Sequence, residues 1–328
     1  MLGFGIATSH PAGMLRSKED WTAALTRMMD PASTNIMPHS AKLELETPGV
    51  IDSYIERIHG AIGKLRDMVR AYNPDAIIMI GDDQGEWFSD ENSPTFAIYT
   101  GDEALWGRRA YPMTTPIPER EKLIFPVNGE LSRYLLKGLV HRGFDMANIS
   151  TFIPRGEPDR GVSHMVANIL PEIVPELDIP IVTVLMNEYY PPLPSAERCI
   201  QLGAAIGDVM AERPERVMIY ASGGLSHFPG MFNRGWIDTA FDEWLIQRLE
   251  SHDIEALKNL FTFDSDMMRA GTGEVRAWLS VAAAMKRGAR FVDYVPAHGA
   301  ITGCGFAYWP AVGDDVTREM SALAQTTR

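Results

Sequence analysis

Short apolar runs alternate with segments of helical periodicity along the chain. The apolar runs are rich in Ile, Val, Met and Ala, and glycine, proline or polar residues bound them. Runs of this kind are typical of buried strands. We therefore predict strands at residues 3–8, 76–80, 179–187, 216–224, 291–298 and 303–310.

Helical periodicity is clearest in residues 52–72, whose apolar side chains fall on one face: Ile55, Ile58, Ile62, Leu65 and Val69. Further helices are predicted at residues 130–144, 195–214, 241–251 and 274–288. Interleaved strands and helices predict an α/β fold, a single domain over residues 1–328 with a central mixed or parallel sheet covered by helices. The proline-rich stretch 111–121 is predicted to be a surface excursion within that domain.

Polar or ionisable residues stand where four of the predicted strands end. These residues are His10, Gln84, Glu188 and His227. Ligands of α/β sheets bind at the carboxyl ends of the strands, so we expect the active site at that edge. The glycine pair of GGLSH (223–227) allows the backbone to approach closely just before His227, which suits a positioned acid or base.

Composition narrows the classes of protein and partner. The net charge of −13 opposes binding to a nucleic-acid backbone. Two cysteines, Cys199 and Cys304, are too few for a disulfide framework or a zinc–thiolate site. No segment has the pattern of a signal peptide or the apolar length of a membrane span, so we expect a cytoplasmic protein without a membrane partner.

An ordered set of motifs resembles one enzyme family. The set comprises SH at 9–10, a polar turn after the second strand, PTFAI at 94–98, GGLSH at 223–227, GTGEVRAW at 271–278 and the closing strand GCGFAYWP at 303–310. The same order occurs in class III extradiol ring-cleavage dioxygenases, and the chain is most similar to the catalytic β-subunits of the two-chain enzymes. The resemblance runs from His10 to Trp309 and makes residues 1–328 one catalytic domain of this type.

The resemblance implies a mononuclear Fe(II) held by two histidines and one glutamate, which is the ligand set of many non-haem iron oxygenases. A catechol-type aromatic ring and dioxygen would be the substrates. Carried over residue by residue, His10 and Glu274 match two of the ligands, and His227 matches the catalytic acid–base histidine.

Two positions depart from the family pattern. Gln84 stands where the second histidine ligand is expected, and an amide oxygen in its place would favour Mn or another divalent metal over iron. His39 is the substitute ligand that we consider. In DRGVSH (159–164), Arg160 stands at a histidine position, which leaves His164 to enter the pocket as a catalytic residue.

Several side chains keep more than one interpretation. Asp82, Asp83 and Gln84 could instead bond the turn or orient another ligand. Arg160 suits a substrate carboxylate, and Tyr189 and Tyr190 suit an aromatic ring.

Two other functions stay open beside the dioxygenase. Loss of the second histidine could leave a metal-dependent hydrolase or lyase on the same scaffold. The chain could also be a non-catalytic assembly subunit, although such a subunit has no need of His10, His227 and Glu274. We expect a homo-oligomer, with the lid over the site supplied by a small partner chain or by residues 100–125.

Overall fold

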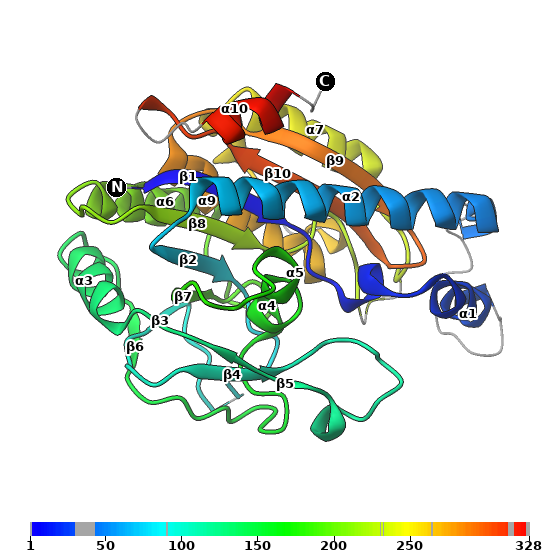
Figure 1. Cartoon of the computed structure of the whole chain (residues 1–328), viewed down its shortest axis with the longest axis horizontal. Helices are drawn as coiled ribbons and strands as arrows, with labels where there is room; N and C mark the ends of the chain where they lie inside the picture. The colour runs from blue at the N-terminus through cyan, green and yellow to red at the C-terminus, as the bar shows by residue number, and fades with distance from the viewer. Residues whose placement is uncertain are drawn as a thin grey trace.

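The computed structural model describes residues 2–29, 43–89, 91–229, 231, 233–263, 265–313 and 318–325. Within these residues, one eight-stranded sheet runs through the molecule (Figure 1). In spatial order its strands are β6 (Ala147–Ile149), β3 (Phe96–Tyr99), β7 (Ile181–Met186), β2 (Ala76–Gly81), β8 (Val217–Ser222), β1 (Leu2–Thr8), β10 (Thr302–Trp309) and β9 (Arg290–Ala297).

The centre of the sheet is parallel. β2 runs parallel to β7 and to β8, and β1 runs parallel to β8, with Ile6 opposite Tyr220. The flanking strands β3 and β10 are antiparallel to their central neighbours, so the sheet is mixed, as predicted. The carboxyl ends of β1, β2, β7 and β8 therefore meet at one edge.

Helices cover both faces of the sheet. One face carries α1 (Lys18–Met29), α2 (Pro48–Tyr72), α4 (His164–Ala167), α5 (Leu170–Ile173) and α10 (Arg318–Gln325). The other carries α3 (Gly129–Val140), α6 (Ala196–Met210), α7 (Thr239–Glu250), α8 (Ile254–Leu257) and α9 (Val275–Met285). Among the described residues, no helix combines the length and the apolar character that a membrane crossing requires.

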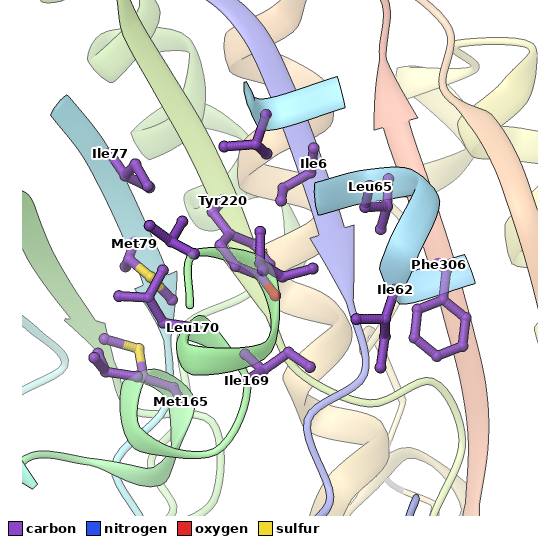
Figure 2. Packing of buried hydrophobic residues seen from close by; sticks show 14 of the residues in the cluster. Ile6, Ile62, Leu65, Ile77, Met79, Met165, Ile169, Leu170, Tyr220 and Phe306 are labelled. Atoms are coloured by element: carbon purple, nitrogen blue, oxygen red, sulfur yellow. The ribbon is translucent and has the colours of Figure 1, made fainter. Parts of the chain in front are cut away.

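The apolar row predicted from the sequence is the face that α2 buries. Ile58, Ile62, Leu65 and Val69 are all buried against the sheet. Each such side chain contributes about 1.5–3 kcal/mol through its removal from water. Figure 2 shows this core continuing below α2, where residues of α4 and α5 lie beside Met79 and Tyr220 of the sheet.

A separate two-stranded hairpin holds the loop that precedes α4. It consists of β4 (Leu105–Arg108) and β5 (Lys122–Phe125), and the proline-rich stretch 111–121 forms its largely exposed tip, as predicted. The nitrogen of Val162 donates to the carbonyl of Trp106 across 2.8 Å. Gly161 has φ +88° and lies against Trp106 where a Cβ would not fit. The hairpin thereby fixes the path of the chain into His164.

The predicted segments correspond to β1, α2, β2, α3, β7, α6, β8, α7, α9, β9 and β10. The sequence did not indicate α1 and α10, the short strands β3 and β6, the β4–β5 hairpin or the one-turn helices α4, α5 and α8.

Candidate metal centre

Four buried side chains gather at the carboxyl edge of the parallel strands. They are His10, Asp82, His164 and Glu274, and one ligand atom of each lies within 4.8 Å of those of the others. His10 follows β1 and Asp82 follows β2, while His164 begins α4 and Glu274 ends the short 3-10 helix Ala270–Glu274. The cluster therefore draws on segments far apart in the sequence.

The hydrogen bonds of His10 aim its Nε2 atom into the cluster. Its Nδ1 lies 2.9 Å from the hydroxyl of Ser222, which uses its single proton to donate to the carbonyl of Met165 at 2.7 Å. Ser222 must therefore accept from His10 Nδ1–H. The Nε2 of His10 then faces Glu274 Oε2 at 3.3 Å, an arrangement that a cation between them or a proton on Nε2 stabilises.

His164 is held in the same sense by Glu86. Its Nδ1 lies 2.6 Å from Glu86 Oε1, and its Nε2 faces Asp82 Oδ1 at 3.5 Å. Burial by itself lowers the pKa of His164, but the charges of Glu86 and Asp82 outweigh it and raise that pKa to about 10. Burial by itself raises the pKa of Glu86. The charge of the His164 imidazolium and its hydrogen bond outweigh burial and lower that pKa to about 2.

Asp82 supports a cation at this site. Both of its carboxylate oxygens, and Nε2 of His164, are buried without a hydrogen-bond partner among the described residues. Burial raises the pKa of Asp82 to about 6. Unpartnered buried polar atoms are costly, and a divalent cation would satisfy these three atoms together. Two imidazoles and two carboxylates fit such an ion in donor type and in charge.

Glu274 is the most heavily contacted member of the cluster. Its Oε2 accepts a hydrogen bond from the backbone nitrogen of Gly224. Its Oε1 accepts from the hydroxyl of Tyr189 at 3.1 Å and from the amide nitrogen of Gln84 at 3.2 Å. The charges and hydrogen bonds of His227 and His10 overcome the effect of burial and hold the pKa of Glu274 well below its usual range. The Glu274 carboxylate is thus held in place by hydrogen bonds to both oxygens, and it stays ionised.

His227 stands beside the cluster with one nitrogen committed to the backbone. Its Nδ1 donates to the carbonyl of Leu225 at 2.9 Å, and its Nε2 lies 3.3 Å from Glu274 Oε1. Burial by itself lowers the pKa of His227, but Glu274 outweighs it and raises that pKa. Gly224 and Gly271 lie so close to the ring that neither position has room for a Cβ. This is the close approach that the glycine pair suggested.

The remaining predicted residues take varied positions. Gln84 reaches Glu274 through its amide nitrogen, which is a hydrogen-bond donor and not a metal ligand. Asp83 accepts from the backbone nitrogens of Trp87 and Phe88 and so stabilises the turn. His39 lies outside the described residues.

Arg160 faces carboxylates of its own chain. Its Nε lies 2.6 Å from Glu157 Oε2, and its Nη1 lies 3.9 Å from Glu86 Oε1.

Glu188 is fully buried and both its oxygens lack a hydrogen-bond partner among the described residues. Burial, with the charges of Asp82 and Glu274, raises its pKa well above the usual range.

Sequence reasoning did not assign Asp82 to the cluster. The only signal was its place as the first polar residue after β2. Asp82 Oδ1 lies 3.5 Å from Nε2 of His164, whereas Gln84, two residues later, contacts Glu274 through its amide nitrogen.

Comparisons with known proteins indicate a family for the chain. The family model described as catalytic LigB subunit of aromatic ring-opening dioxygenase matches residues 34–304. The curated relatives found include proteins named 2,3-dihydroxyphenylpropionate/2,3-dihydroxicinnamic acid 1,2-dioxygenase. The one from Mycobacterium sp. (strain MCS) is 26% identical over 193 residues, which are 58% of this chain and 55% of the relative. The one from Mycolicibacterium smegmatis is 28% identical over 200 residues, or 61% and 58%.

The chain thus matches little more than half the length of these relatives. Among solved structures, an uncharacterised protein from Escherichia coli K12 aligns with a TM-score of 0.49 at 14% identity, covering 93% of this chain and 99% of that chain.

Proposed function

Because the chain belongs to the family of the catalytic LigB subunit of aromatic ring-opening dioxygenases, we propose that it opens the ring of a catechol-type substrate with dioxygen, beside the hydroxyl groups. Residues 1–328 would form one catalytic domain. The observation that carries the proposal is the buried cluster His10, Asp82, His164 and Glu274 with His227 at its edge.

The cluster would hold the metal ion. Its imidazole nitrogens and carboxylate oxygens suit Fe(II), the metal we propose, and also suit Mn(II). Gln84 stands where the family has its second histidine ligand, and His164 and Asp82 would together take the place of that histidine. When bound, the metal supplies the redox and Lewis-acid chemistry that lets dioxygen react with the aromatic ring.

His227 would move protons during the reaction. Its Nδ1 is occupied by the carbonyl of Leu225, so Nε2 is the atom that exchanges a proton with the substrate. Glu274 raises the pKa of His227, so the ring can both accept and donate a proton at Nε2.

Two tyrosines would orient the ring of the substrate. Burial and the charge of Glu274 raise the pKa of Tyr189 well above its usual range, so its hydroxyl stays a donor next to the cluster. Tyr190 borders a cavity of about 600 Å³ together with Phe88 and Asn187. Since Arg160 is paired with Glu157, we propose the tyrosines rather than this arginine as substrate-binding residues.

The test is the reaction itself. Protein purified without oxygen is analysed for metal, reloaded with Fe(II) and mixed with catechols under an oxygen electrode. We expect oxygen uptake that matches the formation of a ring-opened product absorbing visible light. A metal-loaded protein that takes up no oxygen with any catechol but hydrolyses or cleaves other substrates would instead support the Lewis-acid hydrolase or lyase.

A further inference from the structure

We propose that Glu86 is a positioning residue that fixes His164 as a metal ligand. The inference rests on the metal site of the proposed function but concerns a residue outside it. Glu86 lies in the turn after β2, with 3% of its surface exposed. Its Oε1 lies 2.6 Å from His164 Nδ1, and its Oε2 accepts from the backbone nitrogen of Gln84 at 2.9 Å.

This contact determines which nitrogen of His164 faces the cluster. A carboxylate can only accept, so the Nδ1 of His164 must carry a proton. The lone pair available for a metal is then the one on Nε2, which has no hydrogen-bond partner among the described residues and faces Asp82. A carboxylate behind a histidine also makes the imidazole a stronger ligand.

The backbone around His164 is anchored independently of Glu86. The hydroxyl of Ser163 donates to the carbonyl of Asp82 at 2.6 Å, and Met165 is buried in the core of Figure 2. These two contacts bring α4 to the end of β2. They do not orient the His164 ring, which contacts Glu86 through Nδ1 and packs edge-on against the ring of His10. Because Glu86 makes the only hydrogen bond of this ring among the described residues, its loss should misdirect the ligand without detaching the helix.

Arg160 completes a chain of charges from the cluster toward the surface. Its guanidinium lies between Glu157 and Glu86. Glu157 contacts this arginine but not His164, and about half of its side chain is exposed. It therefore offers a control position in the same network.

The experiment measures binding of Co²⁺ alone to metal-free protein by calorimetry. We compare the wild type with Glu86→Gln, Glu86→Asp and the control Glu157→Gln, and record thermal unfolding of each variant. We expect Glu86→Gln to bind Co²⁺ about 10–100-fold more weakly, as outer partners of ligating histidines do when they are changed. The Co²⁺ affinity of Glu86→Asp should lie between those of the wild type and Glu86→Gln. The affinity of Glu157→Gln should stay within about twofold of the wild type.

A double-mutant cycle separates positioning from a merely structural contact. In a His164→Ala background, Glu86→Gln should cause no further loss of Co²⁺ affinity. Equal losses in both backgrounds, or wild-type affinity in Glu86→Gln, would overturn the proposal. The readout needs no dioxygen or catechol, so a wild type that binds Co²⁺ but opens no ring would refute the proposed reaction and leave the role of Glu86 intact.

Discussion

The Nε2 atom of His227 lies 3.3 Å from Oε1 of Glu274, while its Nδ1 is bonded to the backbone. The histidine thus borders the cluster without being one of its four members. His227→Ala should keep the metal content and the fold but lower turnover by about a hundredfold or more, the size expected for an acid–base group. Metal analysis and steady-state oxygen uptake measure the two effects. Loss of metal in this variant would make His227 a ligand.

His10→Ala and Glu274→Ala should behave in the opposite way. Each change removes one ligand side chain from the cluster and leaves three of its four ligand atoms. We expect the metal content after desalting to fall by about tenfold or more, since even outer partners cost that much. Elemental analysis provides the measurement, with His227→Ala as the matched buried-histidine control. A variant that keeps full occupancy would lose its place among the ligands.

Gln84 and His164 compete for the role of second ligand, and their alanine variants distinguish them. His164→Ala should bind metal at least about tenfold more weakly. Gln84→Ala should lose less affinity than His164→Ala, because Gln84 contacts Glu274 only as a donor and Tyr189 still donates to the same oxygen. Calorimetric titration with Mn²⁺ of both proteins gives the answer. The reverse order of affinities would restore Gln84 as the ligand expected from the sequence.

Metal affinity should rise with pH. In the metal-free protein the pKa of His164 is raised to about 10, so the ring carries an extra proton at neutral pH that must leave before Nε2 can bind. Affinity for Mn²⁺ should therefore increase about tenfold per pH unit between pH 7 and 8.5. Below about pH 6, where Asp82 also becomes protonated, the dependence should approach two protons per metal. In His164→Ala, affinity that still rises tenfold per unit above pH 7 would show that another group releases the proton.

A pair of glycine variants tests the packing beneath the site. A Cβ at Gly203 of α6 would collide with the backbone of Ser280 in α9, whereas nothing lies within 4 Å of a Cβ at Gly60 of α2. Gly203→Ala should lower the free energy of unfolding by about 1–3 kcal/mol. Gly60→Ala should raise it by about 0.5–1 kcal/mol through helix propensity. Urea unfolding of the metal-free proteins compares them, and a neutral Gly203→Ala would mean that the two helices can separate without cost.

The sequence predicted most of the sheet because buried parallel strands leave apolar runs, and β2 and β8 fall within a residue or two of the predicted positions. It did not reveal β3 or the β4–β5 hairpin, whose strands are only four residues long. Such strands are stabilised by their neighbours in the sheet, and their own sequence carries little signal.

The site was partly predictable for a related physical reason. His10 and His227 follow predicted parallel strands, so the topology brings them together. His164 follows an irregular loop, and its position depends on the contact of Val162 with Trp106, which no periodicity encodes. The expectations of a homo-oligomer and of a small partner chain stay predictions.

The four cluster residues lie in segments separated by long stretches of chain, with His10 near one end and Glu274 near the other. During synthesis on the ribosome, no short peptide of this protein contains a chelating pair of them. A metal ion held by this cluster would therefore have little to bind until the parallel strands have assembled, and it would bind the folded chain almost exclusively. On the proposed function, the supply of metal would then decide what fraction of the molecules is active, and the apolar sheet and its helices would fold before the ion binds.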